Sequence, residues 1–131
     1  MIDALGKPTG AFARARTLAF VLLGLLLALF IAWHARHYSA PTAVLASAVA
    51  VAPWLLALRP VVRGRPDAYL GGLMLTTPYL GYALMELVAN PGARAIAAVT
   101  VFVSFALAVA FTACLRFSRR AAAAPTSQTA P

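Results

Sequence analysis

The chain has 131 residues, of which 63% are hydrophobic and 11% are charged, and its mean hydropathy is +0.85. A soluble domain of this size leaves much of its surface in water, so the composition excludes an ordinary soluble fold and predicts a single membrane-embedded domain. A net charge of +8 can indicate nucleic-acid binding, but the basic residues here separate long apolar runs, as topology-setting charges beside anionic headgroups do. We therefore expect the lipid bilayer, and no nucleic acid, as the partner.

Two apolar runs in the first half of the chain predict membrane helices. The first covers residues 17–33, about 25 Å as a helix, and follows a mixed segment, residues 1–16. It is longer than the apolar region of a signal peptide and no convincing cleavage site follows, so we expect an uncleaved helix. A polar loop at 34–41 leads to a second span at 42–58, in which Pro53 predicts a kink.

The second half of the chain shows the same alternation of apolar runs and polar turns. Residues 59–67 hold two prolines and a glycine and predict a basic cytoplasmic turn, whose defining residues are Arg59, Arg63, Gly64, Arg65 and Pro66. The third span, 69–89, is the least regular, because it contains three glycines and Pro78. The fourth span, 95–115, carries no charge, Gly or Pro. The composition of residues 121–131 predicts a disordered cytoplasmic tail.

Together the runs predict an all-α membrane protein, an antiparallel bundle of four transmembrane helices within residues 17–120. A soluble helix has a polar face, whereas the run 18–33 has no strongly polar residue on any face. Long unalternating runs also exclude barrel strands. Aromatic residues near the predicted span ends fit interfacial belts: Trp33, Tyr38, Trp54 and Tyr69.

The distribution of basic residues predicts the orientation. Two of them, Arg36 and Arg94, fall on one predicted side of the membrane. Nine fall on the other side: Lys7, Arg14, Arg16, Arg59, Arg63, Arg65, Arg116, Arg119 and Arg120. The positive-inside rule places the nine-charge side, with both termini, in the cytoplasm.

Glu86 is the single acidic residue inside a predicted span. A charge in a membrane helix is costly and suggests a functional site, but Glu86 lies one turn before Asn90, about 6 Å from the predicted helix end, where interfacial water can reach it. Small and polar residues share one face of this span: Gly72, Thr76, Tyr79, Tyr82 and Glu86. Two interpretations stay open. We favour interhelical hydrogen bonding and close packing over a lined path for a proton or small solute.

Two histidines, His34 and His37, lie at the end of the first span on the side predicted for Glu86 and Arg94. Two histidines and a carboxylate can bind a metal or respond to pH, but nothing in the sequence brings these helices together, so we predict no metal and no cofactor. Catalytic motifs are absent, and we predict no catalytic residue. The candidate polar cluster is Glu86, Tyr82, Tyr79, Thr76, His34, His37 and Arg94.

From residue 63 onward the chain resembles a known family. An Arg-Gly-Arg-Pro turn precedes the third span, which contains aromatic residues and has a glutamate near its end. A turn that contains a proline and an arginine follows this span. The matching residues are Arg63, Gly64, Arg65, Pro66, Tyr69, Tyr79, Glu86, Pro91 and Arg94. This pattern, within residues 17–120, resembles the small proteobacterial inner-membrane proteins of domain of unknown function family 2069. Asp67 and the missing histidine near Gly81 and Tyr82 depart from the family pattern. The resemblance implies four helices and the bacterial inner membrane, and it implies no activity.

Three classes of function remain to be distinguished. We favour a non-enzymatic accessory or assembly partner of a larger membrane complex, because the short loops leave little room for a soluble active site. The alternative is an oligomeric transporter or channel subunit in which Glu86 handles a proton or small cation. A membrane enzyme would need the outer polar residues His34, His37, Glu86 and Arg94 to converge.

Overall fold

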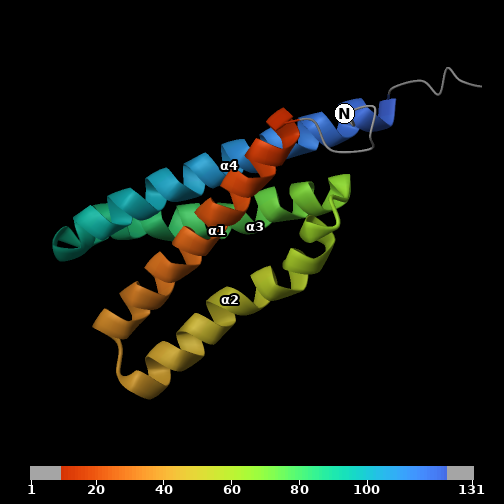
Figure 1. The fold of residues 1–131 in the computed structure, drawn as a ribbon. Helices are drawn as coiled ribbons and strands as arrows, with labels where there is room; N and C mark the ends of the chain where they lie inside the picture. Colours follow the sequence, from red (N-terminus) through yellow and green to blue (C-terminus); the bar gives the residue numbers. More distant parts are fainter. Residues whose placement is uncertain (1–9, 124–131) are drawn as a thin grey trace, which may run out of the picture.

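The computed structural model describes residues 10–123, and this part of the chain is built from α-helices joined by short turns, with no strand (Figure 1). The elements are α1 (Gly10–His37), α2 (Ala40–Val62), α3 (Pro66–Ala89), a 3₁₀ turn η1 (Pro91–Ala93) and α4 (Arg94–Ala123). The predicted all-α class is confirmed. Each apolar run of the sequence falls within one helix.

The helices are longer than the predicted spans, and the connections are correspondingly shorter. Residues 34–41 were expected to form a polar loop, but α1 continues to His37 and α2 begins at Ala40. Pro41 lies in the first turn of α2, where a proline is tolerated because its missing N–H would have no intrahelical partner. At the chain ends, residues 10–16 and 121–123 are helical. The rest of the predicted terminal segments, including Lys7, lies outside the described residues.

The predicted basic turn begins later than expected. Arg59 and Pro60 belong to the last turns of α2, which ends at Val62, so the break that Pro60 predicts does not occur there. The carbonyls that end this helix keep partners, since the backbone N–H of Arg63 donates to Arg59. The chain reverses at Gly64, whose φ of 74° is the left-handed conformation that glycine adopts without a steric penalty.

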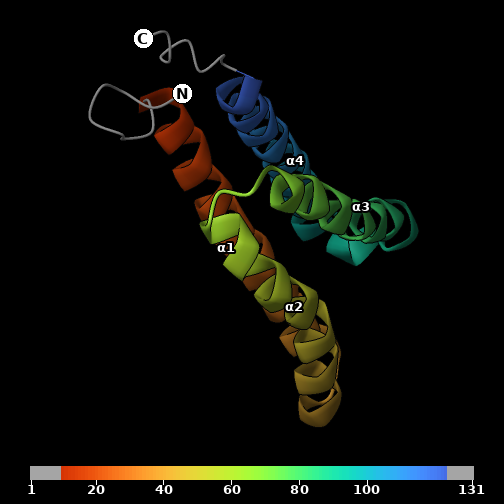
Figure 2. The same cartoon turned by 90° about the vertical axis from the view of Figure 1, so that its right-hand side faces the viewer.

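Successive helices reverse direction and form two hairpins, α1 with α2 and α3 with α4 (Figures 1 and 2). In the second hairpin α3 packs along the length of α4. The backbone of α1 approaches α4, whereas α1 reaches α3 through side chains such as Phe30, whose ring centroid lies 4.9 Å from that of Tyr79. The backbone of α2 approaches α1 and α3 but, within the described residues, not α4. The end of α2 that begins at Ala40 leans away from α3 and α4 (Figure 1).

Large aromatic side chains fill the space where the four helices meet. Trp54 of α2 is 1% exposed and stacks on Phe111 of α4, with ring centroids 6.0 Å apart and planes 11° apart. Tyr69 is fully buried near the same ring. Both rings therefore lie in contacts between helices, and their depth in the membrane stays a prediction. In an alanine-rich chain few other side chains are large enough to fill the gaps between helices.

The close approach of α3 and α4 depends on Gly72. A Cβ atom at this position would lie 3.0 Å from the Phe111 ring, whereas a Cβ at the neighbouring Gly71 would meet nothing within 4 Å. Small residues at a helix contact allow two backbones to approach closely, which is how membrane helices gain packing energy. Gly72 thus positions α4 against the face of α3 that carries Thr76 and Tyr79.

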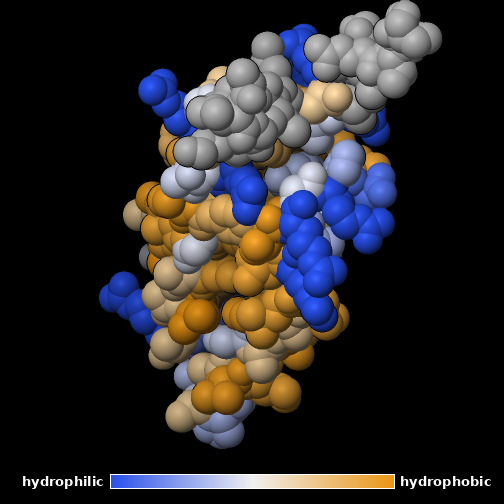
Figure 3. Space-filling model, turned by 45° about the vertical axis from the view of Figure 1, so that its right-hand side comes forward, coloured by the Kyte–Doolittle hydropathy of each residue, from blue (hydrophilic) through white to orange (hydrophobic). Residues whose placement is uncertain are grey.

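Three helical stretches are long and apolar enough to cross a membrane: Gly10–His37, Ala40–Val62 and Pro91–Ala121. The third predicted span, α3, is not among them, because tyrosines, threonines, glycines and Glu86 lower its apolar character. Large apolar side chains point outward from the helices, for example Leu56 of α2 and Phe102 of α4. Figure 3 shows apolar side chains over the middle of the molecule and hydrophilic side chains concentrated toward one end.

Candidate functional site at the Glu86 end

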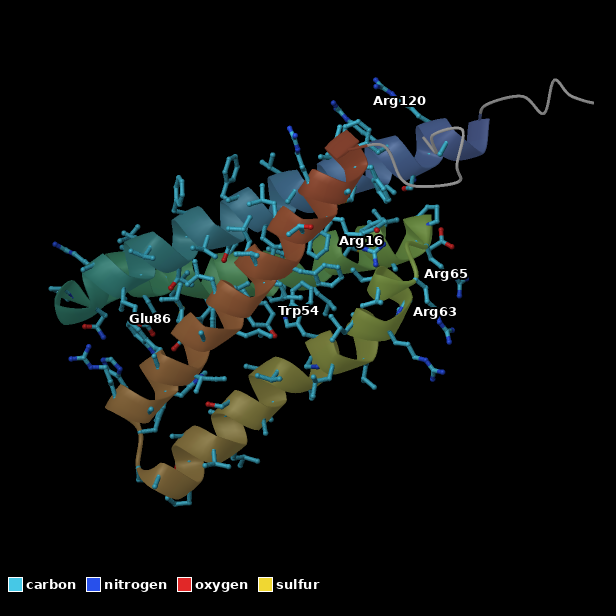
Figure 4. The ribbon with its side chains drawn as sticks, in the orientation of Figure 1. Arg16, Trp54, Arg63, Arg65, Glu86 and Arg120 are labelled. Atoms are coloured by element: carbon cyan, nitrogen blue, oxygen red, sulfur yellow. The ribbon has the colours of Figure 1, made fainter. Side chains whose placement is uncertain are left out.

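Glu86 lies on the last turns of α3, at the end of the molecule opposite the arginine-rich turn (Figure 4). Its side chain is half-buried. It borders a small cavity between three helices, which is lined by Leu29, Phe30, Trp33, Tyr82, Ala83, Glu86, Ala97 and Thr100. Tyr82, one turn earlier on α3, contributes the second polar side chain of the predicted cluster to this cavity.

The cavity is mostly apolar, and its volume is about 10 Å³, roughly the space that one water molecule needs. The Thr100 hydroxyl is not available to a molecule in the cavity, because this hydroxyl donates to the Ile96 carbonyl of its own helix at 2.8 Å. The Phe30 ring lies beside both tyrosines, with its centroid 5.7 Å from that of Tyr82 and 4.9 Å from that of Tyr79. The cavity has room for one water molecule beside Glu86 and is too small for a hydrated cation.

Thr76 and Tyr79, the predicted path-lining residues, direct their hydroxyls to backbone carbonyls. The Thr76 hydroxyl donates to Gly72 of the same helix at 2.8 Å, in a site that is 1% exposed. The Tyr79 hydroxyl donates across to the Ala50 carbonyl of α2. Ala50 lies in the turn that Pro53 weakens by removing one backbone donor. The Thr76 hydroxyl is therefore satisfied within its own helix, whereas the Tyr79 hydroxyl joins α3 to α2.

The two histidines lie on α1 but do not converge with Glu86 into a metal site. His34 is buried and stacks on Tyr38, with ring centroids 5.7 Å apart, and its Nδ1 has no hydrogen-bond partner. His37 is exposed, stacks on Trp33 at 4.4 Å, and its Nδ1 lies 3.0 Å from the Trp33 carbonyl oxygen. Within residues 10–123 no three side chains of His, Cys, Asp or Glu come together as a metal ion would require.

Arg94 begins α4 and is exposed. In the described part of the chain no arginine or histidine nitrogen lies within 4.0 Å of the Glu86 carboxylate. Arg36 and His37 of α1 face η1 across an open recess of about 220 Å³. This recess is also lined by Gly92, Ala93 and Ile96. The structure thus brings the predicted outer residues to one end and leaves them as separate groups.

At the opposite end, the basic turn includes a contact that sequence reasoning missed. Arg16 of α1 donates from Nη2 to the carbonyl of Val62 at 2.7 Å, where α2 ends. A cation at a helix C-terminus is favourable because the last carbonyls lack intrahelical partners and carry partial negative charge. Arg63 and Arg65 are exposed beyond this contact (Figure 4). Arg16 therefore ties the two ends of the first hairpin together.

Trp33 and Trp54 are both buried, which their positions in the sequence did not reveal, because a tryptophan near a span end fits an interfacial belt as well as a helix contact. The one available signal was that the glycine- and alanine-rich neighbours leave room for a ring. Periodicity alone cannot say which helix the ring contacts.

The comparisons with known proteins agree with this architecture. No curated protein and no solved structure matches the chain. A family of predicted membrane proteins, domain of unknown function family 2069, matches residues 18–119, and its description names no enzymatic activity. That match covers most of the sequence, including all of α2 and α3 and most of α1 and α4. The chain therefore belongs to this family of predicted membrane proteins.

Proposed function

We propose that this protein crosses the bacterial inner membrane four times with both termini in the cytoplasm, and that it serves as a non-enzymatic accessory or assembly partner of a larger membrane complex. The 24 residues of α3 extend about 36 Å, enough to cross a hydrocarbon core of about 30 Å. A crossing by α3 also keeps the described arginines separated by side: Arg36 and Arg94 at one end, and Arg14, Arg16, Arg59, Arg63, Arg65, Arg116, Arg119 and Arg120 at the other.

Cysteine accessibility tests this topology. Cys114 is buried and is the single cysteine of the chain, so a Cys114→Ala background can carry one new cysteine at Ser39, Arg63 or Asn90. A membrane-impermeant maleimide applied to intact spheroplasts should label positions 39 and 90 and spare position 63. Labelling of 63 together with 90 would show that α3 does not cross.

The observation that supports an accessory role is the small buried fraction of α2. Within the most apolar stretch of α2 only 11% of residues are buried, against 33% in α1. The exposed face of α2 carries Val44, Ala48 and Ala52 at four-residue spacing, a pattern that permits close approach of another membrane helix. Meanwhile Thr76 and Tyr79 are committed to backbone carbonyls, so the interior offers no continuous polar path.

Site-specific photocrosslinking tests this role. A photoreactive amino acid at Val44 or Ala48 of α2 should give one discrete protein adduct in native membranes, because a partner helix covers this face. Phe102 of α4, which is 73% exposed, provides the matched control and should give lipid adducts alone. Lipid adducts at all three positions would contradict the accessory role.

The transport alternative depends on Glu86 and Tyr82, which border the same small cavity between α1, α3 and α4. In this alternative an oligomer completes the path, since the cavity of one chain admits no hydrated cation. Light scattering corrected for bound detergent gives the oligomeric mass, and a clean monomer would count against transport. In proteoliposomes the exchange Glu86→Gln should then abolish proton or cation uptake. Unchanged uptake in that variant would exclude Glu86 as the carrier.

A further inference from the structure

A groove runs along the outward face of α4 at the basic end of the molecule. Its volume is about 530 Å³, and the residues that matter for its chemistry are Phe105, Val109, Thr112, Arg116, Phe117 and Arg120. These positions follow one helical face. The groove therefore extends along the axis of α4, away from the cavity near Glu86 and separate from the exposed face of α2.

The first part of the groove is apolar. Phe105 and Val109 are 62% and 55% exposed, so they present hydrocarbon to whatever lies in the groove. The Thr112 hydroxyl donates to the Ala108 carbonyl of the same helix at 2.8 Å, which leaves the Thr112 methyl group as its outward feature. An alkyl chain can lie here without leaving a polar group unsatisfied.

The end of the groove is cationic. Arg116 and Arg120 are one helical turn apart and exposed, and Arg120 points away from the other helices (Figure 4). Guanidinium groups bind phosphate oxygens in a bidentate manner, which makes arginine well suited to phosphate recognition. Among the described residues the one carboxylate at this end is Asp67, on the first turn of α3.

The spacing of the two parts matches one lipid. Phe105 and Arg116 are 11 positions apart, about 16 Å along the helix and about half the thickness of the hydrocarbon core. We propose that the groove binds one anionic phospholipid, with an acyl chain along Phe105 and Val109 and its phosphate on Arg116 and Arg120. In the proposed topology this lipid lies in the cytoplasmic leaflet. The leaflet rests on the proposed topology, whereas the binding itself does not.

Native mass spectrometry of the full chain in detergent tests the proposal, with phosphatidylglycerol and phosphatidylcholine added at equal concentration. The natural sequence should retain one phosphatidylglycerol in clear preference. The double variant R116Q/R120Q should retain roughly tenfold less, since each basic group near a lipid surface contributes appreciably to anionic-lipid binding. The matched variant R63Q/R65Q removes the same charge from the basic turn, outside the groove, and should bind as the natural sequence does.

Equal losses in the two double variants would overturn the proposal, because they would show attraction to net charge without a site. Displacement of the lipid by millimolar inorganic phosphate would also overturn it, since a free anion would then be the ligand. The variant A108L keeps both arginines, fills the groove and should weaken retention. This variant decides the matter if R116Q/R120Q does not fold. A reversed topology in the cysteine experiment would change the leaflet and leave the binding result intact.

Discussion

Helices α2 and α4 are both long and apolar enough to cross a membrane, yet they relate to the rest of the protein differently. In its most apolar stretch α4 has 39% of residues buried, against 11% in α2. Buried residues occur on successive turns of α4, including Leu107, Phe111 and Cys114, whereas α2 has three in all: Ala43, Trp54 and Val61. Hydropathy reports the affinity of a helix for lipid, whereas packing against a neighbouring helix depends on the shape of the contact surface. Two apolar helices can therefore be buried to different extents.

The shape difference has an identifiable origin. Gly72 lets α4 lie against α3 along its length, because no Cβ separates the helix from the Phe111 ring. The attachment of α2 depends instead on a few specific contacts: the stacking of Trp54, the bond from Tyr79 to Ala50 and the bond from Arg16 to Val62. A helix held by so few contacts can exchange lipid neighbours for a partner helix at small cost.

Of the single substitutions that test these contacts, Trp54→Ala should weaken the attachment of α2 most strongly. Removing a large buried ring from a packed core lowers the free energy of unfolding by about 3 kcal/mol, and here the ring is the main contact of α2 with Phe111. Denaturation in mixed micelles measures the loss, and hydrogen exchange should show increased opening confined to α2. Leu56→Ala is the control, since Leu56 is 81% exposed, and its effect should be small. Equal effects of the two changes would contradict the attachment that we describe.

The substitution Gly72→Leu should loosen α4 in turn. The new side chain meets the Phe111 ring where a Cβ alone comes within 3.0 Å, and overpacking of this kind costs about 1–3 kcal/mol. Gly71→Leu adds the same side chain to the open face of α3 and should leave the unfolding free energy nearly unchanged. A ranking of the two variants in the opposite order would show that α3 and α4 do not meet at Gly72.

The smallest expected effect belongs to Tyr79→Phe, which removes the hydroxyl that bonds to Ala50 and leaves the ring. Interhelical hydrogen bonds in membranes contribute about 0.6 kcal/mol on average, so the same denaturation assay should show a loss of that order. Tyr82→Phe is the matched control, because its hydroxyl borders the Glu86 cavity. A loss larger than that of Trp54→Ala would mean that α2 depends on this bond more than on Trp54.

The number and order of the helices could be predicted from sequence, because unbroken apolar runs have one stable form in lipid. Their ends could not be predicted as well. His34–His37 and Arg59–Val62 are polar or proline-containing and still helical, since the backbone continues to be hydrogen-bonded beyond the apolar core. The shared face of Thr76 and Tyr79 followed from helical spacing, but the acceptor of the Tyr79 hydroxyl depended on which helix lies opposite.

The sequence by itself determined that this is an all-helical membrane protein with its basic residues toward one end, since composition and charge spacing alone dictate how a chain partitions into a bilayer. Only the tertiary structure decided which polar groups remain available. It bonds the Tyr79 hydroxyl to the backbone of α2, puts Glu86 beside a small cavity between three helices, and buries Trp54 against Phe111. These outcomes depend on contacts between residues far apart in the chain, which periodicity along one helix does not encode.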